Sequence, residues 1–240
     1  PVITSNGGGD VASINFAENT TIATAVTTVT STDANAGDTK NYTIYGGADG
    51  ALFSIDSSTG VLTFKASPNY EVPTDADRNN IYDVRVMVTD SKGASDTQTL
   101  SVYVTNVNDN TPVITSNGAG TSATVSIPQL TSAVTTVTST DGDAGDVLKY
   151  TLSGTNSNLF TIDTTSGTLT FITPPAYNAG GGNTYYVTVT VTDIAGHTDT
   201  QDLTVNVTNI DNIAPTLAIS SDKALLGSGK TATITFTFSR

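Results

Sequence analysis

The segment NVNDNTP, residues 106–112, places several side-chain oxygens close together in front of a proline. Its polar members include Asn106, Asn108, Asp109 and Asn110. Calcium in proteins takes oxygens from carboxylates, amides and backbone carbonyls. Asn and Asp also favour turns and proline ends a strand ladder, so a plain linker explains the same letters. The segment therefore predicts either a linker or one side of a calcium site whose other ligands come from distant segments.

The charge balance excludes some partners. The chain of 240 residues has 9 Lys plus Arg against 22 Asp plus Glu, a net charge of -13. Nucleic acid and anionic membranes need basic patches, so we expect no nucleic acid and no direct membrane contact. The same charge is compatible with calcium ions as partners. The chain has no cysteine, which excludes disulfides and thiolate metal sites.

Internal repetition is the strongest organisational signal. PVITSN occurs at Pro1 and again at Pro112, and AVTTVTSTD occurs at Ala25 and again at Ala133. LFSIDSSTGVLTF at Leu52 also returns in a closely similar form. Two units of roughly a hundred residues are a normal size for sandwich domains. We predict domains at 1–108 and 109–211, and a third, incomplete segment at 212–240.

Each repeat has the two-residue period of half-buried strands, which predicts an all-β fold. In the first repeat the inward residues are Tyr82, Val84, Val86 and Val88, followed by Leu100, Val102 and Val104. In the second repeat they are Tyr185, Val187, Val189 and Val191, followed by Leu203, Val205 and Val207. The segments SSTG and TTSG lie between apolar runs, so we expect hairpin turns there.

The tail from Pro215 has a different pattern. Two strand-like runs surround a GSGK turn, with Ala232, Ile234, Phe236 and Phe238 on one face. Two strands cannot bury such a face alone, so the tail is expected to be poorly packed. It resembles the start of a bacterial Ig-like domain. With the opening on Pro1, this indicates a piece of a longer protein.

The junction motif resembles the linker of cadherin repeats, usually DxNDNxP, with Asn106 in place of the leading Asp. Other cadherin motifs occur in the same order: FAENTT with Glu18, SPNYEVP with Asn69 and Glu71, STDGDAGD with Asp141 and Asp143, and VTDIAG with Asp193. The resemblance covers residues 1 to about 212. It is to tandem bacterial cadherin-like repeats of a large secreted adhesin of the RTX type, and it implies two Ig-like Greek-key β-sandwiches plus a truncated third β segment.

The resemblance also implies a set of calcium ligands at the repeat junction. Those near the first repeat would be Glu18, Asn69, Glu71, Asn106 and Asp109; those near the second would be Asn108, Asp141, Asp143 and Asp193; and Val107 and Asn110 would offer backbone carbonyls. The carboxylates would repel one another without metal and would clamp the two domains into a stiff rod with it. Asp33, Asn35 and Asp90 match the upper half of a similar junction, a partial site at the N-terminal end.

Several positions depart from the family pattern. Asn69 and Asn106 are neutral where carboxylates are usual, so we expect affinity at the weak end of the roughly 10⁻⁴–10⁻³ M range of extracellular modules. At the far end of the second repeat, Gln129 and Asn178 replace Glu18 and Glu71, and only Asp211 remains in the motif NIDNIAP. We therefore predict little or no calcium there.

No catalytic motif is present, and the single histidine, His197, is expected to be a solvated turn residue, so we predict that the chain is not an enzyme. The first functional hypothesis is a calcium-rigidified stalk segment of an extracellular, cell-surface bacterial adhesin. The second is an adhesion module that binds polysaccharide or another cell-surface protein through its own surface. The chain has no Trp, and its few aromatics favour the first hypothesis.

Overall fold

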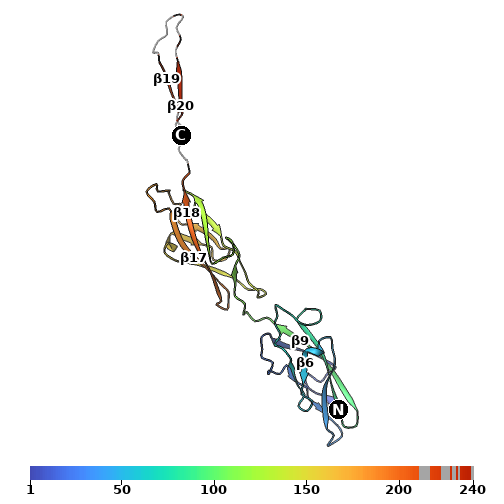
Figure 1. Cartoon of the computed structure of the whole chain (residues 1–240). Coiled ribbons are helices and arrows are strands. Elements are labelled where there is room, and N and C mark those ends of the chain that lie inside the picture. Colours follow the sequence, from blue (N-terminus) through green and yellow to red (C-terminus); the bar gives the residue numbers. More distant parts are fainter. Residues whose placement is uncertain (211–216, 223–227, 229–230, 232, 239–240) are drawn as a thin grey trace. The chain divides into compact units, whose positions relative to one another are not determined.

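The structure is a computed structural model that describes residues 1–210, 217–222, 228, 231 and 233–238 (Figure 1). These residues form strands and short 3₁₀ turns without an α-helix, as the all-β prediction requires. The chain divides into two compact units. The first unit comprises 1–114, 139–149 and 191–199, and the second comprises 115–138, 150–190 and 200–240.

The first repeat is built from a four-stranded sheet, a three-stranded sheet and a short pair. The four-stranded sheet has the order β2 (Val11–Ala17), β9 (Ser95–Thr105), β8 (Ile81–Asp90) and β5 (Lys40–Gly46). The three-stranded sheet has the order β3 (Thr27–Thr28), β7 (Val61–Phe64) and β6 (Phe53–Ile55), and β1 (Val2–Ile3) pairs with β4 (Ser31–Thr32). A 3₁₀ turn, η1 (Gly50–Leu52), precedes β6. Strand β2 is parallel to β9, so the first long strand lies beside the last.

The second repeat has the same strand order. Its four-stranded sheet is β11 (Ser122–Pro128), β18 (Thr198–Thr208), β17 (Thr184–Thr192) and β14 (Lys149–Ser153). Its three-stranded sheet is β12 (Ala133–Thr136), β16 (Thr168–Phe171) and β15 (Phe160–Ile162), and β10 (Val113–Ile114) pairs with β13 (Ser139–Thr140). The turn η2 (Ser157–Leu159) precedes β15, and β11 is parallel to β18.

The predicted inward residues form the cores. All those predicted on β8 and β9 are buried, as are those on β18. On β17 the valines are buried, but Tyr185 is only half-buried, unlike the fully buried Tyr82 of the first repeat. The Tyr82 hydroxyl lies within hydrogen-bond distance of the Thr74 amide at 3.1 Å, so the longer β7–β8 loop covers that ring.

The segments SSTG and TTSG form the predicted hairpin turns between β6 and β7 and between β15 and β16. In the first turn, Asp56 Oδ1 accepts hydrogen bonds from the Ser58 and Thr59 amides at 3.0 and 2.7 Å. Gly60 follows with φ +73°, and a Cβ there would lie 2.1 Å from the Val29 carbonyl oxygen. The turn therefore needs glycine for both its backbone angle and its close approach.

The Gly60→Ala substitution should destabilise the first repeat, because it adds a backbone clash to left-handed strain. Overpacking costs roughly 1–3 kcal/mol and left-handed strain roughly 1–2 kcal/mol. Gly7→Ala is the matched control, since Gly7 has φ +87° but open space around its Cβ position. Thermal melts should show a larger loss for Gly60→Ala than for Gly7→Ala. Equal losses would contradict the role of the Val29 contact.

The tail contributes an antiparallel pair, β19 (Leu217–Ser221) and β20 (Ile234–Phe238). Ile219, Ile234 and Phe236 are exposed, which agrees with the expected poor packing. Asp211, Pro215 and Ala232, which the sequence analysis singled out, lie outside the described residues. Within the described ranges, no helix has the length and apolarity to span a membrane.

Candidate metal centre

Four carboxylates, which we name the linker cluster, meet within the first compact unit: Glu18, Glu71, Asp109 and Asp143. Each offers an oxygen, and these oxygens all lie within 4.8 Å of one another. Glu18 and Asp143 are buried, Glu71 is half-buried and Asp109 is exposed. Glu18 follows β2, Glu71 lies in the β7–β8 loop, and Asp143 lies in the loop after β13. The fold thus gathers residues that are far apart in the sequence.

Backbone amides hold the two buried members in place. Glu18 Oε2 accepts a hydrogen bond from the Tyr70 amide at 2.7 Å, and its Oε1 accepts one from the Val107 amide at 2.8 Å. Asp143 Oδ2 accepts a hydrogen bond from the Asn110 amide at 2.8 Å. These bonds fix both ends of the linker segment against carboxylates, so its position depends on the cluster.

A second cluster of carboxylates in the same unit consists of Asp141, Asp146 and Asp193, whose oxygens also lie within 4.8 Å of one another. The Asp143 amide donates to Asp141 Oδ1 at 2.9 Å, so the two clusters adjoin. The predicted grouping differs here, because Asp143 joins Glu18 and Glu71 rather than Asp141 and Asp193. Asp146 was not predicted. It stands at the end of the quoted segment STDGDAGD, which is the signal that would have included it.

Several oxygens in these clusters and in the linker segment are buried without a hydrogen-bond partner. They are Glu71 Oε2, Asn108 Oδ1, Asp141 Oδ2 and Asp146 Oδ2. Buried polar atoms are normally paired, and an oxygen can be paired by a donor or by a cation. The predicted residues therefore fit a hard metal ion, with carboxylate and amide oxygens of the type that calcium prefers.

The two asparagines that replace carboxylates have different positions. The Asn106 side-chain oxygen faces Glu18 Oε1 at 3.2 Å and Glu71 Oε1 at 2.8 Å, where a rotated amide would instead donate hydrogen bonds to both. With an ion bound, the Asn106 side-chain oxygen can be a ligand; without an ion, the rotated amide can donate hydrogen bonds to both carboxylates. Asn69 Oδ1 accepts a hydrogen bond from the Val72 amide at 2.7 Å. Its side chain therefore stabilises its own loop.

Electrostatic repulsion is visible at Glu71. Burial raises the pKa of Glu71, and the negative charges of Glu18 and Asp143 raise it further. The cluster therefore favours a proton, or another positive charge, at this position. This is the physical condition under which a divalent cation stabilises a folded protein.

A third group lies at the other end of the first repeat and contains Asp33, Asp38 and Asp90. The predicted Asn35 contributes its backbone amide, which donates to Asp33 Oδ1 at 2.8 Å and is the main cause of the lowered pKa of Asp33. Asp33 also forms an ion pair of 3.1 Å with the amino group of Pro1. Asp38 was not predicted, although it occupies the position in the first repeat that Asp146 has in the second.

At the far end of the second repeat, Gln129 takes the position of Glu18. Its Oε1 accepts a hydrogen bond from the Tyr177 amide at 3.0 Å, and its Nε2 donates to Asn209 Oδ1 at 3.0 Å and to the Ile210 carbonyl at 3.1 Å. Asn178 Oδ1 accepts from the Gly180 amide. The neutral side-chain amide of Gln129 thus uses both its oxygen and its nitrogen in hydrogen bonds within the protein. That this end binds little or no calcium stays a prediction.

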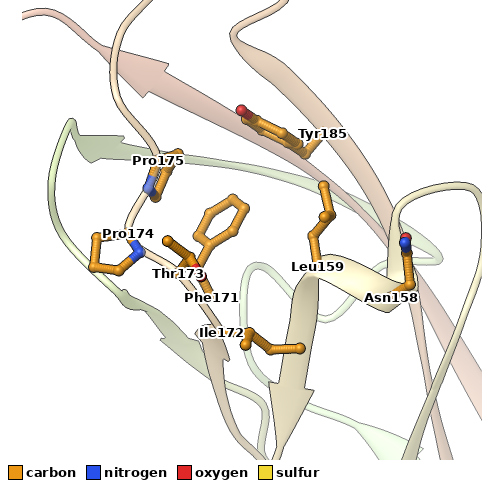
Figure 2. Close-up of a pocket in the computed structure, with 8 residues that line it drawn as sticks. All are labelled: Asn158, Leu159, Phe171, Ile172, Thr173, Pro174, Pro175 and Tyr185. Carbon is orange, nitrogen blue, oxygen red and sulfur yellow. The ribbon is translucent and has the colours of Figure 1, made fainter.

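The second unit carries an apolar pocket of about 400 Å³. Its lining is Asn158, Leu159, Phe171, Ile172, Thr173, Pro174, Pro175 and Tyr185. Figure 2 shows the Phe171 ring between the two prolines and Leu159. In the first repeat, Lys65 stands where Ile172 does, and its Nζ donates to the Ala51 carbonyl at 2.8 Å. The pocket has no charged group, so it can contact apolar groups but offers no acid–base chemistry.

Comparisons with known proteins decide the fold family. The model of the cadherin domain matches residues 12–105. The structure of human CDH23 EC21-23 superposes with a TM-score of 0.70 at 18% identity, covering 100% of this chain and 81% of that one. The fold is that of tandem cadherin domains.

Curated relatives include mouse Protocadherin Fat 4, which is 31% identical over 58% of this chain and 3% of its own length. Human Protocadherin Fat 1 is 29% identical over 90% of this chain and 5% of its own length. This chain thus spans only a small part of these relatives. Cadherin domains are adhesion modules rather than enzymes, so the family match confirms the prediction of a non-enzymatic chain.

The histidine, which we predicted to be a solvated turn residue, is partly exposed and also has a carboxylate partner. His197 Nδ1 lies 2.7 Å from Asp193 Oδ2, and the side chain is 40% exposed. Burial alone would raise the pKa of Asp193. Hydrogen bonds from the His197 side chain and amide outweigh burial and lower this pKa overall. The same hydrogen bond raises the pKa of His197. The sequence reading missed this pair because it treated AGHTD as a solvated turn.

The raised pKa of Glu71 predicts how stability depends on pH in a chelator. The folded state holds this proton more tightly than the unfolded state, so the contribution is fully present below the ordinary value of 4.5 and is lost as pH rises through the raised pKa. Denaturation in chelator should therefore show the free energy of unfolding falling over this range. The Glu71→Gln variant should show a smaller fall; an identical fall would assign the effect to other groups.

Proposed function

We propose that the two repeats form a calcium-stiffened spacer in a cell-surface adhesion protein. The observation that carries this proposal is the linker cluster, in which four carboxylates converge on the segment that joins the repeats. The described residues contain two ion pairs, at Pro1 and His197, and neither belongs to this cluster. Calcium would supply the positive charge that these carboxylates lack.

Stiffening follows from the way in which the linker is held. The Val107 and Asn110 amides are bonded to Glu18 and Asp143, which belong to segments on either side of the linker in the sequence. Calcium bound by these carboxylates, with Asn106 and Asn108 nearby and carbonyls of Val107 and Asn110 as further ligands, would lock the linker to both segments. A locked linker would transmit force and orientation from one repeat to the next.

The wider setting is part of the proposal. The curated relatives named above are mouse and human protocadherins, and this chain covers only 3% and 5% of their lengths. We propose an extracellular location, because millimolar calcium is needed to fill sites of the expected affinity. The parent as a large secreted bacterial adhesin, and residues 212–240 as the start of an Ig-like domain, stay predictions from the sequence.

The alternative, an adhesion module that binds through its own surface, is supported by the apolar pocket of the second unit. Ile172 is 63% exposed there, next to two prolines. Such a lining suits an apolar side chain of a partner protein, because burial of apolar area drives the contact. This candidate does not need calcium, so the experiments below separate it from the spacer.

The first test is a thermal melt of the chain in millimolar calcium and in chelator. An ion that binds only the folded state stabilises it by RT ln(1 + [L]/Kd), about 2.7 kcal/mol at a hundredfold excess over Kd. We expect a clear rise in Tm with calcium. The double variant Asp109→Asn and Asp143→Asn should lose most of this rise, because it keeps the hydrogen-bond acceptors and removes two charges.

The matched control is Asp10→Asn, which removes one exposed charge outside the clusters. It should keep the full rise in Tm. The absence of any calcium-dependent rise in the parent chain would reduce NVNDNTP to a plain linker. A rise that survives in the double variant would place the stabilising ion elsewhere.

The second test measures stiffness directly. Small-angle scattering should give a broad distribution of maximum dimensions in chelator and a narrower one in calcium, because the bound ions remove linker rotations. The double variant should stay broad under both conditions. Narrowing of the double variant to the same extent as the parent would contradict the role of Asp109 and Asp143, even if calcium binds.

A further inference from the structure

The loop between β7 and β8 contains an acidic residue with no role in the clusters above. Asp75 is only 3% exposed. Its Oδ2 accepts a hydrogen bond from the Asn79 amide at 2.7 Å, but its Oδ1 is buried without a hydrogen-bond partner. A buried carboxylate oxygen without a donor loses hydration and gains nothing in return. This atom points to a missing ligand.

A second carboxylate faces the same place. The Asn79 amide bonds Asp75 and its side chain bonds Asp77, so the two carboxyl groups lie on either side of one residue. Burial raises the pKa of Asp77, and the hydrogen bonding and charge of the neighbouring Asp75 raise it further. Asp77 Oδ2 accepts a hydrogen bond from Asn79 Nδ2 at 2.8 Å. Within the described residues, neither carboxylate has an ion pair, and Arg78, which follows Asp77 in the chain, has none either. Two negative charges thus adjoin without a cation.

Further hydrogen bonds that do not involve this pair also position the loop. Asp49 Oδ1 accepts a hydrogen bond from the Ala76 amide at 2.7 Å, and its Oδ2 accepts one from the Asp83 amide at 2.8 Å. Asn80 Nδ2 donates to the Tyr70 carbonyl at 2.9 Å. The two carboxylates therefore meet because the loop is fixed, and not because they attract each other.

The site is open to solvent. Asp75 lines a surface depression of about 550 Å³ together with Thr74, Arg78 and Glu71 of the linker cluster. Asp77 is itself exposed. The depression and the exposed Asp77 carboxylate bring solvent, and with it dissolved ions, next to Asp75.

We propose that Asp75 and Asp77 bind a calcium ion in the β7–β8 loop, with Asp75 Oδ1 as the buried ligand. The remaining ligands would be oxygens of the loop and water, since calcium takes about 6–8 oxygens in flexible geometry. Neither Asp75 nor Asp77 belongs to the linker cluster. The second repeat provides an internal comparison, because its corresponding loop, residues 172–183, has no Asp or Glu.

The test is a calcium titration of the full chain, starting in chelator and followed by amide NMR, which reports each loop separately. Amides of residues 76–80 should shift and saturate. Asp77→Asn should raise the calcium concentration at the midpoint of their titration at least tenfold. The midpoint for the linker amides of residues 107–110 should stay unchanged. Asp75→Asn should do the same, since its amide oxygen can still accept the Asn79 hydrogen bond. Asp10→Asn should change neither midpoint.

The two proposals fail separately in this experiment. Saturation of residues 76–80 without any change at 107–110 would support this site and overturn the calcium linker. Linker saturation with residues 76–80 unmoved at about 10 mM calcium, well above the weakest affinities of extracellular modules, would overturn this site. An unchanged midpoint at 76–80 in both Asp75→Asn and Asp77→Asn would also overturn it.

Discussion

Repulsion among carboxylates is the constraint on which the junction depends. The folded chain brings four of them within 4.8 Å, and the raised pKa of Glu71 shows that the folded state resists their full ionisation. The backbone amides that bond Glu18 and Asp143 offset part of the repulsion between the carboxylates, but amide dipoles cannot neutralise several full charges. The folded chain therefore carries an excess of negative charge, not neutralised by its own groups, in the segment where one repeat leads into the next.

The two repeats share the same β-sandwich but have different residues at one end. Comparing them distinguishes what the fold requires from what the charge adds. Glu18 and Gln129 both accept a hydrogen bond from a tyrosine amide, at 2.7 and 3.0 Å. The fold thus needs an acceptor at this position but not a carboxylate. The carboxylate adds charge, and charge adds affinity for ions. The charge of the linker cluster therefore comes from particular residues, such as Glu18, on a scaffold that both repeats share.

Much of this organisation was readable from the sequence, because it follows from local rules. The two-residue period placed Val84, Val86 and Val88 in the core, and the internal repetition predicted two similar β units. The sequence did not separate Asp143 from Asp141, since side chains two residues apart on a loop point in directions that only the turn decides. Asp38 and Asp146 were not predicted as cluster members, because each meets its partner carboxylates only through the folding of separate loops. Tyr185 is half-buried for a related reason: the covering loop of its repeat is shorter, and loop length does not alter the strand pattern.

The parallel pairing of β2 with β9 has a mechanical consequence. The pair runs from Val11 opposite Thr99 to Ala17 opposite Thr105, so the first long strand and the last lie side by side in the same direction. A pull that separates the ends of the repeat acts on β2 from its beginning and on β9 from its end. The strands are then loaded in shear, and the hydrogen bonds between them share the force instead of opening one after another. The β11–β18 pair repeats this arrangement, so each sandwich is built to resist tension along the chain.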